Sequence, residues 1–66
     1  MKKQIPPATL ERYKLLIKDA KNIMNCQELT GIHNMTINKI IKNGFATQDH
    51  IDKLDAYCDE VETVNA

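Results

Sequence analysis

Residues 29–44 of the 66-residue chain read LTGIHNMTINKIIKNG. Gly31 lies between two short apolar-patterned segments, where a positive φ would end one helix and turn the chain toward the next. Ile32 would then return to the core, and Ile37 and Ile40 follow at a three-residue interval on one helical face. The stretch therefore predicts a helix-turn-helix.

The outer face of the second of these helices, expected over about 34–43, is polar and carries no acid. Hydrogen-bonding groups and cations without acids are what a surface needs when it meets base edges and phosphates. His33 is equally suited to contact a phosphate or base and to cap the helix. We predict DNA contacts from six residues, namely His33, Asn34, Met35, Asn38, Lys39 and Lys42.

The other predicted contacts also have structural alternatives. Asn34 and Asn38 stand one helical turn apart, so both amides can reach one groove and hold adenine. Asn34 is alternatively a helix cap, and Asn38 an indifferent surface residue. Lys39 and Lys42 suit a guanine edge or a phosphate, or serve only solubility. Met35 suits a thymine methyl group, or fills an irregular gap in the core.

The segment GIHNMTINKIIKNG resembles the helix-turn-helix of the phage Cro and repressor proteins, the lambda-repressor-like family, and is particularly similar to its Cro members. The likeness rests on Gly31 and Ile32 at the turn, Ile37-Asn38-Lys39 in the second helix, Ile41, and Gly44 after its end. It implies that the six residues named above occupy the positions from which base edges and phosphates are contacted. Where the family usually has a small residue this chain has Gln27, which predicts a shifted or shortened preceding helix.

Elsewhere the apolar pattern predicts an all-α fold, a small helical domain of four to five helices without strands. Residues 1–7 are expected to form a flexible arm, because Pro6 and Pro7 donate no backbone hydrogen bonds. Helices are expected over residues 8–22, 26–30, 34–43 and 48–61, followed by a frayed tail over 62–66.

Residue types near the ends of these segments add detail. A buried stripe is expected on the first helix, made of Leu10, Tyr13, Leu16, Ile17, Ala20 and Met24. Asn25 and Glu28 have the spacing of a capping box for the second helix. Thr47 is a good cap for the last helix, and Phe45 is expected in the core.

The charges are separated along the chain, although the formal net charge is zero. Residues 1–44 carry eight of the nine cations and three of the nine acids, a net charge of +5, whereas residues 45–66 have a net charge of −5. Such a layout orients a protein on a phosphate backbone, with Lys2, Lys3 and Lys42 expected at phosphates. Alternatively, these charged residues simply form ordinary solvated helix faces, and the separation of positive and negative charges has no functional meaning.

Two functions from different classes are compatible with this sequence. The first is a sequence-specific double-stranded DNA-binding transcriptional regulator, acting on an operator as a homodimer. The dimer would form through helices, using the face of residues 51–61 or Leu15 and Ile23. The alternative is a protein-interaction module, antirepressor-like or antitoxin-like, that acts through the acidic helix over residues 48–62.

The chain is expected to be a single domain, 1–66, without enzymatic activity, cofactor, small-molecule substrate or membrane partner. It has no serine, no glycine-rich phosphate loop and no apolar run long enough for a membrane span or signal peptide. Cys26 and Cys58 are expected to be free thiols in a cytoplasmic protein. With His33 and His50 they match no usual zinc spacing, so no metal site is expected.

Overall fold

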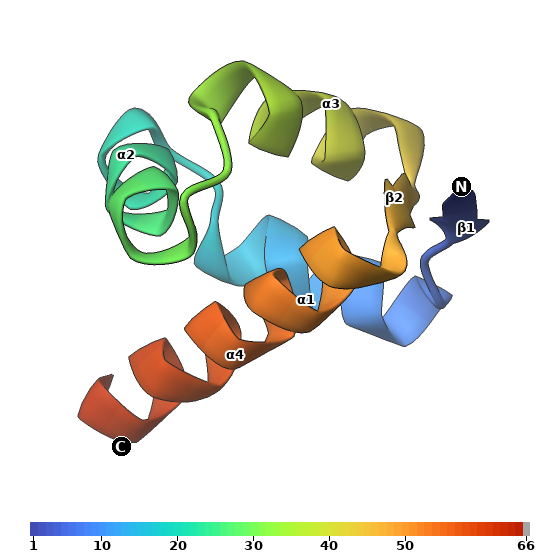
Figure 1. The fold of residues 1–66 in the computed structure, drawn as a ribbon. Coiled ribbons are helices and arrows are strands. Elements are labelled where there is room, and N and C mark those ends of the chain that lie inside the picture. Colours follow the sequence, from blue (N-terminus) through green and yellow to red (C-terminus); the bar gives the residue numbers. More distant parts are fainter. Residues whose placement is uncertain (66) are drawn as a thin grey trace.

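The computed structural model describes residues 1–65, with side-chain burial for residues 1–63. This part of the chain forms four helices and two short strands, arranged in one body (Figure 1). In chain order they are β1 (Lys2–Gln4), α1 (Pro7–Leu16), α2 (Ala20–Thr30), α3 (Asn34–Asn43), β2 (Phe45–Thr47) and α4 (Gln48–Asn65). In Figure 1, α3 runs along one side, α1 and α4 along the opposite side, and α2 and the strands lie at the two ends.

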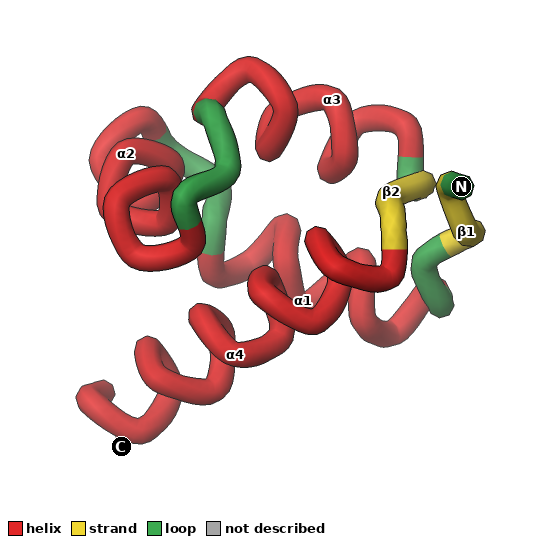
Figure 2. The backbone as a smooth tube through the Cα atoms, in the orientation of Figure 1, coloured by secondary structure: helices red, strands yellow, loops and turns green. Residues whose placement is uncertain are grey.

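The two strands correct both the all-α prediction and the predicted flexible arm. β1 lies beside β2 (Figure 2) and pairs with it in an antiparallel ladder, whose register puts Lys2 opposite Thr47. The backbone nitrogen of Ile5 donates to the oxygen of Gly44 at 2.9 Å, and the Ile5 side chain is only 2% exposed. Burial of this side chain and the ladder hydrogen bonds together fix the first residues of the chain.

The predicted first helix is divided into two. α1 ends at Leu16, and α2 begins at Ala20 after an N-cap residue, Asp19, whose side chain accepts from the nitrogen of Asn22 at 2.9 Å. The cap supplies a partner for an amide that the first turn of a helix leaves unpaired, so a new helix begins there. The predicted capping box at Asn25 and Glu28 is therefore wrong, because both residues lie inside α2.

The new boundary also changes which side chains are buried. Ala20 and Met24, which were expected on the buried stripe, are exposed. Tyr13 and Ile17 are buried as predicted, at 0% and 1% exposed. The predicted stripe assumed one continuous helix through Asp19. It is wrong beyond that residue, because α2 starts there with its own direction and its own buried face.

The helical bounds of the second half of the chain are close to those expected. α3 spans Asn34–Asn43 as predicted, and Gly44 ends it with φ 77°. The hydroxyl oxygen of Thr47 accepts from the nitrogen of His50 at 3.2 Å, at the start of α4. The helix continues to Asn65, beyond its predicted end at residue 61, and Ala66 lies outside the described residues.

The core lies between the helices, and half of its buried residues are isoleucines. Its buried hydrophobic residues are Ile5, Tyr13, Ile17, Cys26, Ile32, Ile37, Ile40, Ala46, Ile51, Leu54, Tyr57 and Cys58. The prediction that Phe45 is buried is wrong, since it is 47% exposed while Ala46 is 1% exposed. Successive residues of a strand point to opposite faces, so Ala46 and not Phe45 faces the core.

Two further features of the described chain bear on its chemistry. Cys26 and Cys58 are both buried and free, as expected. Over residues 1–65, none of the helices combines the length and the apolar character that crossing a bilayer requires.

Candidate functional site

A three-residue connection sets the position of α3 against α2. Gly31 has φ 77° and ψ 6°, and its nitrogen donates to the oxygen of Gln27 at 2.8 Å. The Thr30 hydroxyl donates to the oxygen of Cys26 at 2.7 Å and accepts from the nitrogen of Ile32 at 3.2 Å. Ile32, 4% exposed, then anchors the connection in the core. A side chain at Gly31 would meet no atom within 4 Å, so its left-handed φ is the reason for glycine there.

The start of α3 is fixed by a side chain from α2 that sequence reasoning did not assign. The side-chain oxygen of Gln27 accepts from the backbone nitrogen of Asn34 at 2.7 Å and from its side-chain nitrogen at 2.9 Å. The His33 ring nitrogen Nδ1 accepts from the nitrogen of Met35 at 3.2 Å. Two first-turn amides of α3 are therefore capped within the protein. The sequence pointed to this contact only through the polar residue Gln27, four positions before Gly31.

The six predicted DNA-contacting residues all belong to α3 or its N-cap, and five of them are exposed. Met35 is 62% exposed, which excludes the alternative that it fills the core. Asn34 is half-buried, and its amide is engaged with Gln27. Asn38 is exposed, and its side-chain nitrogen donates to the oxygen of Asn34 at 3.2 Å. The hydrogen bonds thus make Asn34 a positioning residue, whereas Asn38 projects from the outer face.

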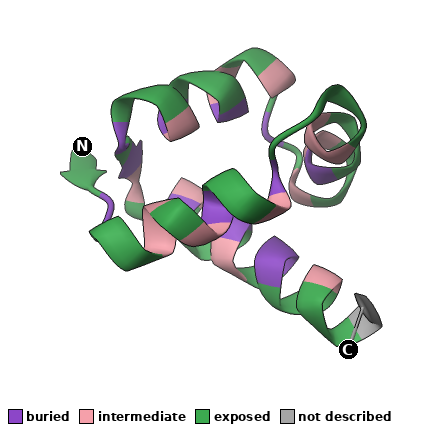
Figure 3. Ribbon diagram, turned by 180° about the vertical axis from the view of Figure 1, so that it is seen from behind, coloured by how far each residue is buried: buried purple, intermediate pink, exposed green. Residues whose placement is uncertain are grey.

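The outer face of α3 is free of ion pairs over the described residues. Ile37 and Ile40 are 0% and 4% exposed and face the core, whereas Lys39 and Lys42 are exposed on other faces of the helix. Figure 3 shows this division, with buried residues on the inner side of α3 and exposed residues on its outer side. None of the salt bridges formed within the described chain involves Lys39 or Lys42. Both ammonium groups therefore remain available to an anion.

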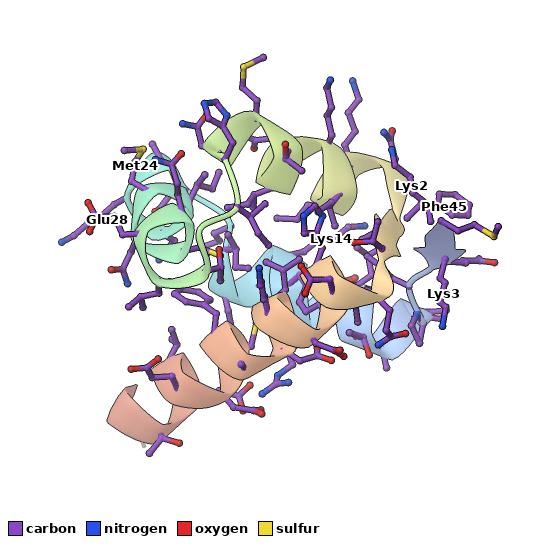
Figure 4. The ribbon with its side chains drawn as sticks, viewed as in Figure 1. Lys2, Lys3, Lys14, Met24, Glu28 and Phe45 are labelled. Atoms are coloured by element: carbon purple, nitrogen blue, oxygen red, sulfur yellow. The ribbon has the colours of Figure 1, made fainter. Side chains whose placement is uncertain are left out.

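A cleft of about 600 Å³ lies beside the C-terminal half of α3, where the strands meet the helix. We call it the basic cleft; it is lined by Lys2, Thr36, Lys39, Ile40, Asn43, Phe45, Thr47 and His50. Figure 4 shows Lys2 and Phe45 next to each other at this end of the molecule, while Met24 and Glu28 lie on α2 at the other end. The lining contains two lysines and a histidine but no acid. Pairing of β1 with β2 is what brings Lys2 to α3.

The acids of α4 are largely occupied by partners inside the molecule. Arg12 on α1 donates to both Asp59 and Glu62, and these hydrogen bonds raise the pKa of Arg12 and lower that of Glu62. The hydroxyl of Tyr13 donates to Asp55 at 2.7 Å. Lys53 pairs with Asp49 at 3.2 Å, and Gln48 donates to Asp52 at 2.8 Å. Of the α4 acids, Glu60 is the one for which the described residues supply no such contact.

The titratable groups of the interior favour no reactive centre. Burial raises the pKa of the Cys58 thiol to about 11 and also raises that of Cys26, so both thiols stay protonated at neutral pH. Burial, and then the hydrogen bond to Asp55, raise the pKa of Tyr13. Residues 1–65 hold no cluster of three or more histidines, cysteines or acids that would suit a metal ion.

Comparison with known proteins gives no relative from which a function can be transferred. No family model, no curated protein and no solved structure matches this chain.

Proposed function

We propose that this protein is a sequence-specific double-stranded DNA-binding regulator of transcription, in which α2 and α3 form a helix-turn-helix and α3 lies in the major groove of an operator. The observation that carries the proposal is the exposed, acid-free outer face of α3. It combines an exposed amide, an exposed thioether and two unpaired ammonium groups on one helix of three turns. These are the groups that bind base edges, thymine methyls and phosphates.

The roles divide along α3 according to the hydrogen bonds. Asn38 and Lys39 read base edges, and Met35 contacts a thymine methyl group. Lys42 and the lysines of β1 bind phosphates, while Asn34 holds α3 against Gln27. Asn38 can exchange its present acceptor for a base without leaving a buried group unpaired, because the carbonyl of Asn34 already belongs to the helical ladder.

The alternative, a protein-interaction module working through the acidic α4, is less well supported. Five of its six acids have a partner within the molecule, so a basic partner would first have to displace Arg12, Tyr13, Lys53 or Gln48. The lysines of α3 are not occupied in this way.

Selection from a random-sequence duplex library at physiological salt tests the proposal. We expect a palindrome to be enriched, with an affinity at least about 10³-fold above that for shuffled DNA. Weak binding without sequence preference would contradict the proposal, and steep loss of binding with salt alone would show only phosphate contact.

Two matched asparagine substitutions then locate the reading surface. Asn38→Ala should cost about 1–3 kcal/mol on the selected site and much less on shuffled DNA. Asn25→Ala, on α2, removes only a 3.4 Å hydrogen bond to the Tyr57 hydroxyl and should change both affinities little. If Asn38→Ala loses equal affinity for the selected site and for shuffled DNA, Asn38 does not read a base.

A further inference from the structure

A shallow groove of about 190 Å³ lies between the C-terminal end of α2 and the middle of α4, away from α3. We call it the α2–α4 groove; it is lined by Leu29, Thr30, Lys53, Ala56, Tyr57 and Glu60. Leu29 is 54% exposed although its side chain is fully apolar, and Ala56 is also exposed. An apolar side chain beside a small residue on an exposed helix gives another helix room to approach closely.

The charges on this part of α4 are complementary to themselves. Lys53 and Glu60 are seven residues apart, so they lie on the same face of α4, two turns from each other. Ala56 and Tyr57 lie between them. When the same face of a second α4 packs antiparallel about a two-fold axis between residues 56 and 57, Lys53 of each copy lies opposite Glu60 of the other. A two-fold interface of this kind forms each ion pair twice.

We propose that the α2–α4 groove is the dimer interface of this protein and that its occupant is α4 of a second copy. Ala56 lies beside the two-fold axis, Leu29 covers the interface from α2, and the Lys53–Glu60 pairs fix the antiparallel register. The C-terminal end of α4 extends beyond the body of the molecule, where a second helix can reach it (Figure 1). This gives Glu60, for which the described residues of one chain supply no partner, a cation across the interface.

The interface differs from both surfaces expected from the sequence. The apolar residues of the 51–61 face, Ile51, Leu54 and Cys58, are buried in the core of one chain and cannot also cover a partner. Leu15 is 69% exposed but lies on α1, outside the α2–α4 groove. Lys53 is paired with Asp49 in one chain, and it can reach Glu60 of the partner by a rotation of its exposed side chain.

The size of the chain limits the area of the interface. The accessible surface is 4508 Å², so an interface of standard size, about 800 Å² per partner, would cover more than a sixth of it. A smaller interface is therefore expected, and with it a weak dimer that forms only at high protein concentration.

Charge reversal tests the register, using the full chain in sedimentation equilibrium. Lys53→Glu and Glu60→Lys each convert two attractive pairs into two repulsive ones and should weaken the dimer about tenfold. The double variant, Lys53→Glu with Glu60→Lys, restores opposite charges and should dimerise within about threefold of the wild type. Circular dichroism of each variant verifies that the helices are intact.

Further variants separate this interface from other outcomes. Ala56→Cys should form a disulfide-linked dimer with an added oxidant, since residues beside the two-fold axis approach closely and the native thiols are buried. Leu15→Lys is the matched control and should leave the dimer unchanged. A wild-type monomer at about 1 mM, loss of the dimer in Leu15→Lys, or no rescue in the double variant would overturn the proposal.

The inference extends the proposed function, because a palindromic operator requires two copies, but the test contains no DNA. A dimer that binds no specific sequence would leave this interface standing and remove the proposed function. Specific DNA binding by a chain that stays monomeric would support the proposed function and remove this interface.

Discussion

The side-chain oxygen of Gln27 on α2 lies 2.7 Å from the backbone nitrogen of Asn34, the first residue of α3. A residue of one helix therefore caps the next helix, and the cap fixes how α3 is presented. The same oxygen accepts from the side chain of Asn34 at 2.9 Å. Both donors belong to a half-buried residue, so removing the acceptor leaves them poorly solvated.

Replacing the acceptor should therefore destabilise the protein. Gln27→Ala is expected to lower the free energy of unfolding by about 1–2 kcal/mol, measured by urea denaturation. Gln27→Glu keeps an acceptor of similar length and adds a favourable charge at the N-terminus of α3, so its stability should stay near that of the wild type. An alanine variant as stable as the wild type would mean that His33 alone holds the start of α3.

The buried thiol of Cys58 should make stability fall in alkaline solution. Its pKa is raised to about 11 from an ordinary value of 9.0, so the folded state holds the proton more tightly than the unfolded state does. The resulting stabilisation is complete below pH 9 and is lost as the pH rises from 9 to 11. Urea denaturation should show a slope of up to about 1.4 kcal/mol per pH unit from this group.

The contribution of Cys58 can be separated from that of the other buried titratable groups. Tyr13, Tyr57 and Cys26 also have raised pKa values, so they add to the same loss in the wild type. Cys58→Ala keeps all three and should show a shallower decline between pH 9 and 11. An unchanged slope would assign the whole loss to the remaining groups.

The pairing of Arg12 with Asp59 and Glu62 should have the opposite pH dependence. The hydrogen bond from Arg12 lowers the pKa of Glu62, so its stabilisation is present above the carboxyl's unfolded pKa and is lost as the pH falls through the folded value. Arg12→Met should therefore lower the thermal midpoint at neutral pH, and the difference from the wild type should shrink in acid.

A second surface pair provides the comparison for Arg12. Within one chain, Lys53→Met removes only the pair with Asp49, one turn away on the same helix, so its effect on the monomer at neutral pH should be smaller. Arg12 joins α1 to α4 through two carboxylates, so its replacement removes a tertiary contact between two helices. Equal effects of the two substitutions would show that the Arg12 network is no stronger than an ordinary surface pair.

The parts of the fold that the sequence predicts are those decided within a few residues. Gly44 ends α3 and Thr47 caps α4 through contacts to neighbouring residues, so both could be located by pattern. The pairing of Lys2 with Thr47 joins residues 45 positions apart, and a three-residue strand has no pattern of its own. Phe45 was misplaced for the same reason, since the strand decides that its neighbour is buried.

The same limit separates the predicted and missed parts of the candidate site. The exposed face of α3 followed from helical periodicity, because Ile37 and Ile40 mark the buried side. Gln27 and Lys2 reach α3 from other elements, and their places depend on how α2 and β1 pack. Spacing along α3 carries no information about either of them.

The fixed position of Lys2 in the basic cleft leads to a prediction about DNA binding. A lysine in a flexible arm would contact many different phosphates, each of them weakly. Lys2 is instead held in a strand and lines the same cleft as Lys39, so it should neutralise one defined phosphate. Lys2→Gln should weaken binding to specific and shuffled duplexes alike and reduce the slope of log affinity against log salt by about 1.

Lys14→Gln, which replaces a lysine of α1 outside the cleft, is the matched control and should leave the slope unchanged. Titration at several salt concentrations measures both slopes, and equal slopes for wild type and Lys2→Gln would place the phosphate elsewhere on the protein.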